Sequence, residues 1–389
     1  MTDLSPLCGM KLGSLACGGT RVLDLSPLKG MMLTQIAFRR TEVSDISPLH
    51  GMPLTYLYFN GSSVNDLSPL KGMPLKQLYC DLKLSRDSEV LRSITTLETI
   101  QDKPAAEFWK DVEAQQAAFD AWTKQVAAMP ADEQVKAVAR KLQELNPGFD
   151  GTVTPTIDGD VVTGLQFLSD DVTDISPVRA LAGLTDLTVA GSQPVARSSP
   201  PKSKLADLSP LKGTRLTRLV CSFSQVADLT PLQGMPLTWL ICNSTEIRDL
   251  SPLHGMPLQG LYCSLTRISD IAPLKGMPLT AFACYATEVS DLTPLKGMEL
   301  TGVDLGETPV ADLTPLKGMP VSFLSVHLTT HLAELSALGG MPLKTLYCDV
   351  KPDRDIELLR SIKTLETING KPAAEFWKEF DQQQKGTKP

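Results

Sequence analysis

Positive charge is scarce in this chain, which has 37 Lys and Arg residues against 44 Asp and Glu residues in 389, a net charge of −7. Binding to nucleic acid or to anionic lipid requires a basic surface, so the composition argues against both kinds of partner. The first twenty residues hold no apolar run of secretory length, and no segment approaches the length of a membrane span. We therefore expect a soluble, cytoplasmic protein with no membrane partner.

Side chains that commonly carry catalysis are also few. There are four histidines, and His50 and His254 take a repeated slot that lysine usually fills, where we expect them to face solvent. No Ser/His/Asp or Cys/His set is supported, because positions far apart in a repeated structure stay far apart in space. An enzyme would need titratable groups clustered in a pocket. We therefore expect no catalytic residue and no cofactor.

The dominant feature of the sequence is a 21-residue repeat. The segment DLSPLKGMPL at 66–75 recurs with small changes from residues 24, 45, 207, 228, 249, 270, 291 and 312. In the unit LTWLICNSTEIRDLSPLHGMP (237–257), the first half alternates apolar and variable residues, as a strand with one buried face does. In the second half, serine suits an N-cap, proline the first helical position and glycine the end of a single turn.

One such unit cannot bury its own leucines. Stacked units can, because their strands pair in parallel about 4.8 Å apart and their inward Leu, Cys, Val and Met side chains form one continuous core. A buried leucine contributes roughly 1.5–3 kcal/mol, which outweighs the ordering cost only where neighbouring units cover it. The repeated residues therefore predict a scaffold and say nothing yet about chemistry.

The unit resembles the leucine-rich repeat, whose pattern LxxLxLxxNxL is matched by LTWLICNSTEI at 237–247, and DLSPL resembles the internalin-type bacterial class. The resemblance implies an α/β fold, a right-handed solenoid with a parallel concave sheet and short 3₁₀ turns on the convex side. Cysteine replaces the third leucine, and a hydroxyl replaces asparagine. This predicts a hydroxyl ladder in place of an amide ladder, in which each hydroxyl bonds neighbouring backbone in the same corner. The hydroxyl positions are Thr20, Thr41, Ser62, Ser224, Thr245, Thr266, Thr287, Thr308 and Thr329.

Two copies of one module make up the chain. KPAAEFW is identical at 103–109 and 371–377, and each copy follows a longer helical pattern that we interpret as a cap. We expect a first array over 1–104, a helix-pair linker or cap over 105–150, and a second array over 151–389. A hairpin at 152–167 should cap the start of the second array, and 352–380 should cap its end.

Two further segments depart from the pattern. The Pro- and Ser-rich insertion at 194–204 predicts a mobile loop, either inert or a tether. The chain starts within a unit, with no cap before Thr2, so we expect the C-terminal part of a longer protein or gene family. The module resembles repeat regions that follow serine/threonine kinase domains in some bacteria, but no glycine-rich loop, HRD or DFG motif is present.

Two residue columns could suggest metal sites. Cys221, Cys242, Cys263 and Cys284 recur once per repeat, and a column about 14 Å long cannot surround one tetrahedral zinc. We expect reduced, buried thiols. The aspartate that precedes each turn should bond backbone amides, and neither SDDVTD (169–174) nor DGD (158–160) has the spacing of a calcium loop. We therefore expect no metal.

Function should lie where the units differ, on the outward positions of the concave sheet. Aromatic and flanking polar side chains on a rigid surface favour protein recognition, although neighbouring rings can also simply stabilise a sheet. The candidate binding residues are Tyr56, Tyr58, Tyr79, Trp239, Ile241, Tyr262, Tyr285, Phe323, His327 and Tyr347. We expect a non-catalytic scaffold for a protein or peptide partner. The alternative is a structural module that self-associates through its uncapped N-terminal edge, as a weak dimer rather than a monomer.

Overall fold

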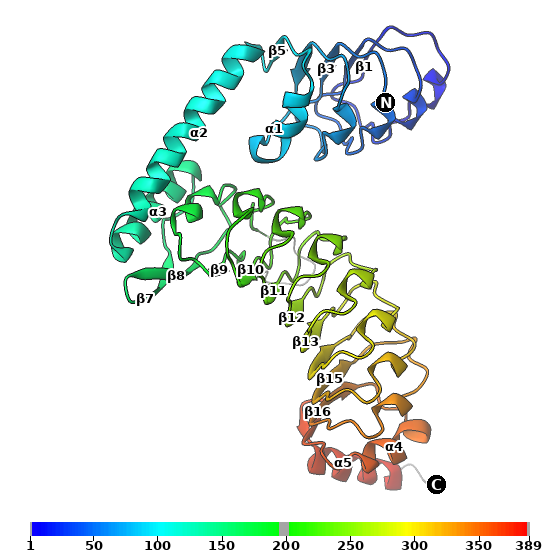
Figure 1. The fold of residues 1–389 in the computed structure, drawn as a ribbon. Helices are drawn as coiled ribbons and strands as arrows, with labels where there is room; N and C mark the ends of the chain where they lie inside the picture. The colour runs from blue at the N-terminus through cyan, green and yellow to red at the C-terminus, as the bar shows by residue number, and fades with distance from the viewer. Residues whose placement is uncertain (1, 194–201, 387–389) are drawn as a thin grey trace. The chain divides into compact units, whose positions relative to one another are not determined.

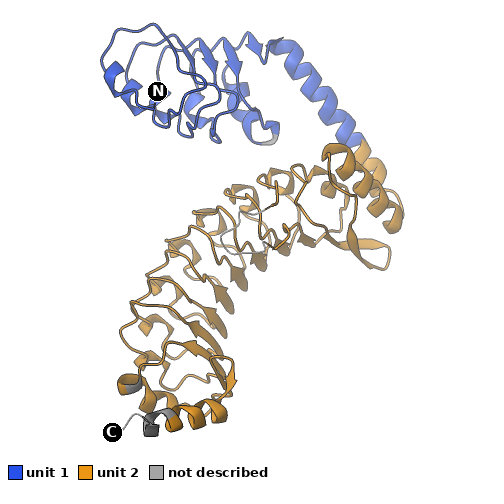
Figure 2. Ribbon diagram, turned by 180° about the vertical axis from the view of Figure 1, so that it is seen from behind, with its two compact units in different colours: residues 1–121 blue, residues 122–389 orange. Residues whose placement is uncertain are grey.

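The computed structural model describes residues 2–193 and 202–386 (Figure 1). The chain divides into two compact units, residues 1–121 and 122–389 (Figure 2), with the boundary inside helix α2 (Ala105–Ala127). Each unit has a buried core of its own, drawn from residues 4–94 in the first and 126–362 in the second. The division of the chain at 104/105 and 150/151 stays a prediction.

The first unit is a six-stranded sheet in chain order with one short turn per repeat. Its strands are β1 (Ser14–Ala16), β2 (Gln35–Ala37), β3 (Tyr56–Tyr58), β4 (Gln77–Tyr79), β5 (Thr99–Ile100) and β6 (Lys103–Pro104). Its turns are the 3₁₀ helices η1 (Ser5–Leu7), η2 (Ser26–Leu28), η3 (Ser47–Leu49) and η4 (Ser68–Leu70), followed by helix α1 (Leu84–Ser93). Strand β1 forms one edge of this sheet, and self-association there stays a prediction.

The second unit begins with helix α3 (Ala131–Leu145) and continues as a twelve-stranded sheet, also in chain order. The strands are β7 (Thr154–Asp158), β8 (Val161–Gln166), β9 (Asp186–Thr188), β10 (Arg218–Val220), β11 (Trp239–Ile241), β12 (Gly260–Tyr262), β13 (Ala281–Ala283), β14 (Gly302–Asp304), β15 (Phe323–Val326), β16 (Thr345–Cys348), β17 (Thr367–Ile368) and β18 (Lys371–Pro372). The turns are η5 (Ser176–Ala180), η6 (Ser209–Leu211), η7 (Thr230–Leu232), η8 (Ser251–Leu253), η9 (Ala272–Leu274), η10 (Thr293–Leu295), η11 (Thr314–Leu316) and η12 (Ser336–Leu338). Helices α4 (Pro352–Ser361) and α5 (Ala373–Gly386) complete the unit. Within it, strands β9 to β16 follow the inner side of the arc (Figure 1).

The repeat sets the strand pairing. In β10 to β12, Leu219 lies opposite Leu240 and Leu240 opposite Leu261, in parallel and at the same position of successive repeats. The middle residue of each of these strands is buried, because it points into the space between sheet and turns. This arrangement confirms the expected solenoid, with parallel sheets and short 3₁₀ turns.

Every turn except η12, where Glu334 takes the position, is held at its start by the aspartate of the DLSPL motif. Asp249 Oδ1 accepts a hydrogen bond from the backbone N–H of Ser251 at 2.7 Å, and its Oδ2 accepts one from the Ser251 hydroxyl at 2.6 Å. These bonds stabilise the carboxylate and lower the pKa of Asp249, the hydroxyl making the largest contribution. The aspartate therefore has the structural role predicted from the sequence. The serine, expected as the N-cap, is instead the first residue of the turn, and the side chain two residues earlier caps it.

The hydroxyl column forms most of its hydrogen bonds with the backbone of the same corner, as the sequence predicts. Thr245 Oγ1 donates to the Cys242 carbonyl at 2.8 Å and Thr266 Oγ1 to the Cys263 carbonyl at 2.6 Å, both within their own repeats. Thr329 differs, because its hydroxyl donates to the Leu305 carbonyl of the preceding repeat at 3.2 Å. Most of the other corner hydroxyls therefore stabilise their own corners.

Seven of the eight cysteines are buried and none forms a disulfide, as the sequence predicts. Cys221, Cys242, Cys263 and Cys284 are fully buried in one inward column. Burial disfavours the thiolate and raises the pKa of Cys221 and of Cys284 to about 12. Since the thiolate is the reactive form, these side chains behave as small hydrophobic groups.

Thiol titration with an aromatic disulfide reagent should therefore separate the cysteines sharply. At pH 8 the folded chain should release one equivalent rapidly, from the exposed Cys8, and the chain in guanidinium chloride should release eight. The matched control is Cys8→Ser, which should remove the rapid phase and leave seven thiols in denaturant. Rapid reaction of two or more thiols in the folded protein would contradict the buried column.

A helix and a hairpin cover the start of the second sheet. Val138 and Leu142 of α3 are buried against the same core as Leu165 of β8, and β7 pairs with β8 in antiparallel fashion around Asp158 and Val161. The side chain of Asn146 closes the junction, because its Oδ1 accepts from the backbone N–H of Thr173 at 2.8 Å. The hairpin predicted at 152–167 is thus present, and its second strand continues into the parallel sheet through β9.

The two modules end in matching caps. Helices α1 and α4 each carry in their first turn an aspartate that is 1% exposed, Asp87 and Asp355. Each carboxylate accepts from the backbone N–H four residues earlier at 2.8 Å, that of Lys83 or Lys351. An arginine on the preceding residue forms an ion pair with each aspartate. In each cap the buried carboxylate therefore has two partners, a backbone N–H and an arginine side chain.

Residues 194–201 of the insertion expected to form a mobile loop lie outside the described residues. Immediately after them, Ser203 is buried and its Oγ lies 2.7 Å from Ser169 Oγ. None of the helices in the described residues has the length and apolar content needed to cross a bilayer.

Candidate functional site

The outward positions of the strands form the candidate surface. In β11, the buried Leu240 lies between the half-buried Trp239 and Ile241, and the same alternation holds in β3 for Tyr56, Leu57 and Tyr58. All ten candidate residues are half-buried or exposed beside buried inward neighbours. The structure therefore places them on the face of the sheets, and their role in binding stays a prediction.

The ten residues are divided between the two units. Tyr56, Tyr58 and Tyr79 belong to the first unit, where the Tyr79 ring lies 5.7 Å from that of Tyr56 and 5.3 Å from that of Tyr58. Arg39 lies over the Tyr58 ring at 5.6 Å, and the Tyr79 hydroxyl donates to Asp102 Oδ1 at 2.8 Å. The hydrogen bond to Asp102 is the main reason that the pKa of Tyr79 is raised.

An aromatic pair lies on strands β11 and β12 of the second unit. The rings of Trp239 and Tyr262 are nearly parallel, 21° apart, with centroids separated by 6.0 Å. The indole lies over Gly260, where an added Cβ would come within 2.1 Å of Trp239 Cε3. Glycine at this outward position therefore allows the Trp239 side chain to pack against the next repeat.

A second aromatic pair lies on strands β15 and β16. The rings of Phe323 and Tyr347 are 6.1 Å apart and tilted by 52°, and both side chains are exposed, by 39% and 36%. His327 follows β15 and is also exposed. Two exposed rings side by side offer apolar surface that the chain itself does not cover.

Small side chains separate the two aromatic pairs. The outward residues of β13 are Ala281 and Ala283, and β14 begins with Gly302, where an added Cβ would meet no atom within 4 Å. Strands β12 and β15 are three steps apart in the sheet, which corresponds to about 14 Å. The two pairs therefore stand on either side of a low floor.

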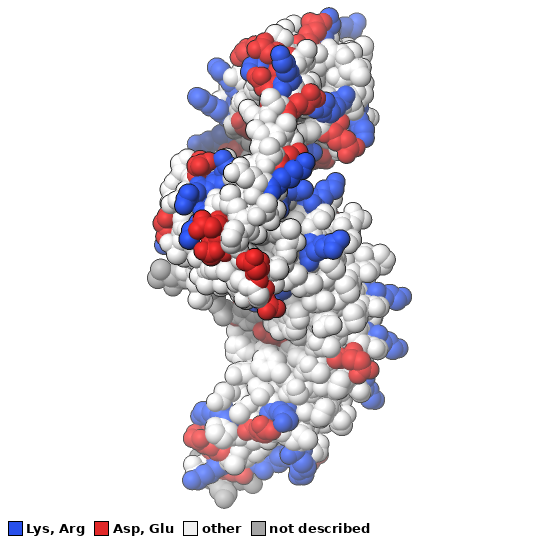
Figure 3. Space-filling view, turned by 60° about the vertical axis from the view of Figure 1, so that its left-hand side comes forward, with Lys and Arg blue, Asp and Glu red and all other residues white. Residues whose placement is uncertain are grey.

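Tyr285 and the charged pair Arg218 and Asp186 on this face are engaged within the chain. The Tyr285 ring lies against Gly306, and its hydroxyl donates to Glu307. Arg218 Nη1 contacts both carboxylate oxygens of Asp186, at 3.0 and 3.1 Å. The second unit shows a broad area without charged side chains in Figure 3, whereas its C-terminal end carries both signs.

Sequence reasoning did not single out Gly260 and Gly306 as positions that seat aromatic rings. The available signal was a glycine at an outward strand or corner position that other repeats fill with a larger residue. For chemistry, the described parts of the chain contain no group of three or more His, Cys, Asp or Glu side chains placed to hold a metal ion.

The burial of the residues at the consensus positions identifies the type of repeat. In the unit at 237–257, Leu237, Leu240, Cys242 and Ile247 are all fully buried, the hydroxyl of Thr245 takes the asparagine position, and the strand pairs in parallel with the matching strands of the repeats before and after it. The chain is a solenoid of leucine-rich repeats. The first unit has the same type of repeat, since Ile36, Leu57 and Leu78 of its sheet are buried in the same register.

Solved structures of other leucine-rich-repeat proteins are similar to this chain. The internalin InlF of Listeria monocytogenes is 19% identical over 92% of this chain and 80% of its own, with a TM-score of 0.44. Internalin C2 (InlC2) of the same organism is 22% identical over 59% and 91%, also with a TM-score of 0.44. The functional domain of its InlJ, described as including a cysteine ladder, is 17% identical over 90% and 66%, with a TM-score of 0.31. No protein-family model and no curated protein sequence matches the chain.

Proposed function

We propose that the chain is a non-catalytic scaffold that binds a protein or peptide partner on the sheet face of its second unit. The observation that carries this proposal is the pair of aromatic clusters, Trp239 with Tyr262 and Phe323 with Tyr347, on either side of a small-residue floor. Tyrosine and tryptophan are the side chains that most often dominate binding energy at protein interfaces.

The rigidity of the surface also supports the proposal. The backbone of each strand is fixed by pairing on both sides, and Trp239 is held between Gly260 and Tyr262. A partner would therefore lose little affinity to ordering of this surface. The floor of Ala281, Ala283 and Gly302 leaves room for apolar side chains of an extended segment, and Asp304 at its end accepts from the Gly306 N–H through Oδ1 at 3.1 Å. We expect the partner segment to be apolar or aromatic and largely uncharged.

The proposal is tested with peptides selected from a random displayed library on the intact chain. For a selected peptide, fluorescence anisotropy should show affinity reduced at least about tenfold by Trp239→Ala with Tyr262→Ala, because aromatic anchors of interfaces are each worth about 2 kcal/mol or more. The melting temperature of the second unit should change by less than about 3 °C, since both rings are half-buried on the surface.

Two controls separate binding from sheet packing. Lys275→Ala changes an exposed residue at the end of turn η9 and should leave peptide affinity unchanged. Tyr58→Ala removes an aromatic residue from the sheet face of the first unit and should also leave it unchanged. Affinity lost only in Tyr58→Ala would count against the second unit as the site. A large fall in melting temperature for the Trp239 and Tyr262 double variant, with affinity intact, would mean that the pair only stabilises the sheet.

A further inference from the structure

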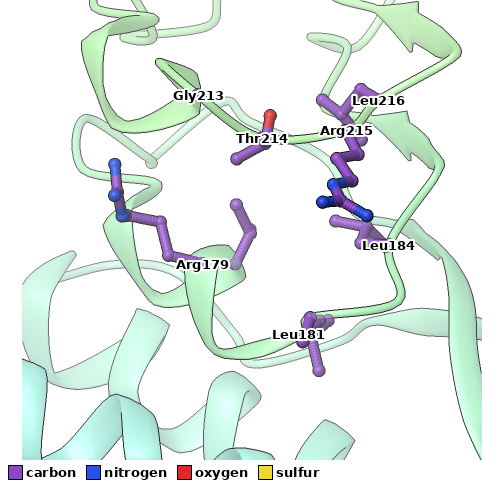
Figure 4. A pocket seen from close by; sticks show the side chains of 9 residues that line it. Arg179, Leu181, Leu184, Gly213, Thr214, Arg215 and Leu216 are labelled. Carbon is purple, nitrogen blue, oxygen red and sulfur yellow. The ribbon is translucent and has the colours of Figure 1, made fainter.

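A cavity of about 230 Å³ opens in the second unit where the repeat pattern is broken. It lies between the segment after η5 and the segment after η6, away from the strands that carry the aromatic pairs. Val178, Leu184 and Leu216 supply its apolar walls, and Arg179, Thr214 and Arg215 supply its polar groups (Figure 4). None of the residues that line it is acidic.

The cavity exists because a methionine is missing. In most repeats the glycine that ends the turn is followed by a methionine that is 3–7% exposed and fills the space between successive turns. These residues are Met31, Met52, Met73, Met235, Met256, Met277, Met298, Met319 and Met341. After Gly213 the position holds Thr214, whose shorter side chain turns back to donate to the Leu211 carbonyl at 2.7 Å. The volume that a methionine would occupy is left open.

The next position is also unusual. Where other repeats have proline after the methionine, as at Pro236 and Pro257, this repeat has Arg215. Figure 4 shows Arg179 and Arg215 on opposite sides of the cavity, with Thr214 between them. Arg179 Nη1 donates to the carbonyls of Pro210 at 3.1 Å and Lys212 at 3.4 Å, which fixes its guanidinium across two repeats. Adjacent departures from the repeat thus open the cavity and place positive charge beside it.

We propose that this cavity binds a small organic anion, one with a carboxylate or phosphate group on a body of a few atoms. A guanidinium presents its N–H groups in a planar fork that matches carboxylate and phosphate oxygens, and two of them flank the opening. An engineered protein cavity of about 150 Å³ holds benzene, so a volume of about 230 Å³ admits a small ligand. Ala182 and the accessible carbon atoms of Leu184 then contact the apolar part of the ligand. This site is independent of the sheet face and of the partner proposed for it.

Isothermal titration of the intact chain with butyrate and with inorganic phosphate tests the proposal and distinguishes the two anion chemistries. Butylamine and butanol serve as cationic and neutral probes of the same size as butyrate. Either anion should bind with a stoichiometry of one, and neither control probe should bind. Equal binding of butyrate and butylamine, or no binding of either anion, would overturn the proposal.

Three variants assign the binding to the cavity. Thr214→Met restores the repeat pattern, so it should fold, fill the cavity and weaken anion binding at least tenfold. Arg215→Gln keeps the cavity and should weaken binding about fivefold. The matched control, Lys275→Gln, removes an exposed cation from another repeat and should have no effect. Anion affinity that is unchanged in both Thr214→Met and Arg215→Gln would place the binding elsewhere and refute the site.

Discussion

Replacing Leu261 by aspartate should unfold the second unit of the chain and leave the first unit folded. Leu261 is fully buried in the middle of strand β12, with Leu240 and Phe282 opposite it on the neighbouring strands. The substitution removes a leucine side chain from the core and leaves a carboxylate there without a partner, at a combined cost of about 5 kcal/mol or more. A folded domain has about 5–15 kcal/mol of stability in total, so the loss is of the same order.

The two units should respond separately, because no residue belongs to both buried cores. Calorimetry of the Leu261→Asp variant should retain the transition of the first unit and lose that of the second, and limited proteolysis should spare the first unit. The reciprocal control is Ile36→Asp, at the fully buried middle position of β2. It should spare the second unit. Loss of both transitions in either variant would contradict the independence of the cores.

Replacing Asp355 by alanine should destabilise the second unit by about 2–4 kcal/mol. The carboxylate is 1% exposed, accepts from the Lys351 N–H at 2.8 Å and pairs with the Arg354 guanidinium. The substitution leaves the backbone N–H of the N-cap residue Lys351 without its acceptor and removes the carboxylate partner of Arg354, which keeps only its bonds to backbone carbonyls. At about 2–4 °C per kcal/mol for a unit of this size, the melting temperature should fall by about 4–16 °C.

Asp355→Asn is the isosteric control, since it keeps an oxygen that can accept from Lys351 and loses only the charge. It should lower the melting temperature by about half as much as alanine. Asp87→Ala removes the corresponding group in the first unit and should lower the transition of that unit alone. Equal melting temperatures for Asp355→Ala and the parent protein would show that the buried ion pair does not stabilise the cap.

Much of the fold could be predicted from the sequence because one physical constraint recurs in every repeat. A unit such as 237–257 must bury Leu237, Leu240 and Ile247 against its neighbours, and only stacking in a constant register achieves this. The hairpin at 152–167 and the matching caps followed from turn residues and from internal identity. These signals are local or repeated in the sequence, so the sequence alone predicts the elements that they mark.

The details that escaped prediction depend on distances between side chains. Serine and aspartate are both good capping residues, and only the 2.7 Å contact from Asp249 to the Ser251 N–H decides between them. The corner hydroxyls bond the backbone of their own corners as predicted, but the exception at Thr329, which donates to the preceding repeat, has no signal in the sequence. The change from Met-Pro to Thr214-Arg215 is visible in the sequence, but the cavity that it opens depends on how two successive turns pack. The binding role of the ten nominated sheet-face residues stays a prediction.

The constant register of the strands has a consequence for how such a chain changes over generations. Leu219 pairs with Leu240 in the same register as Leu240 pairs with Leu261. A gene that gains or loses the codons of one whole repeat therefore still encodes repeats whose strands pair in register. Unequal recombination between near-identical copies would then alter the length of the coil in whole steps. The number of repeats can therefore change between generations more easily than the way in which neighbouring repeats pair.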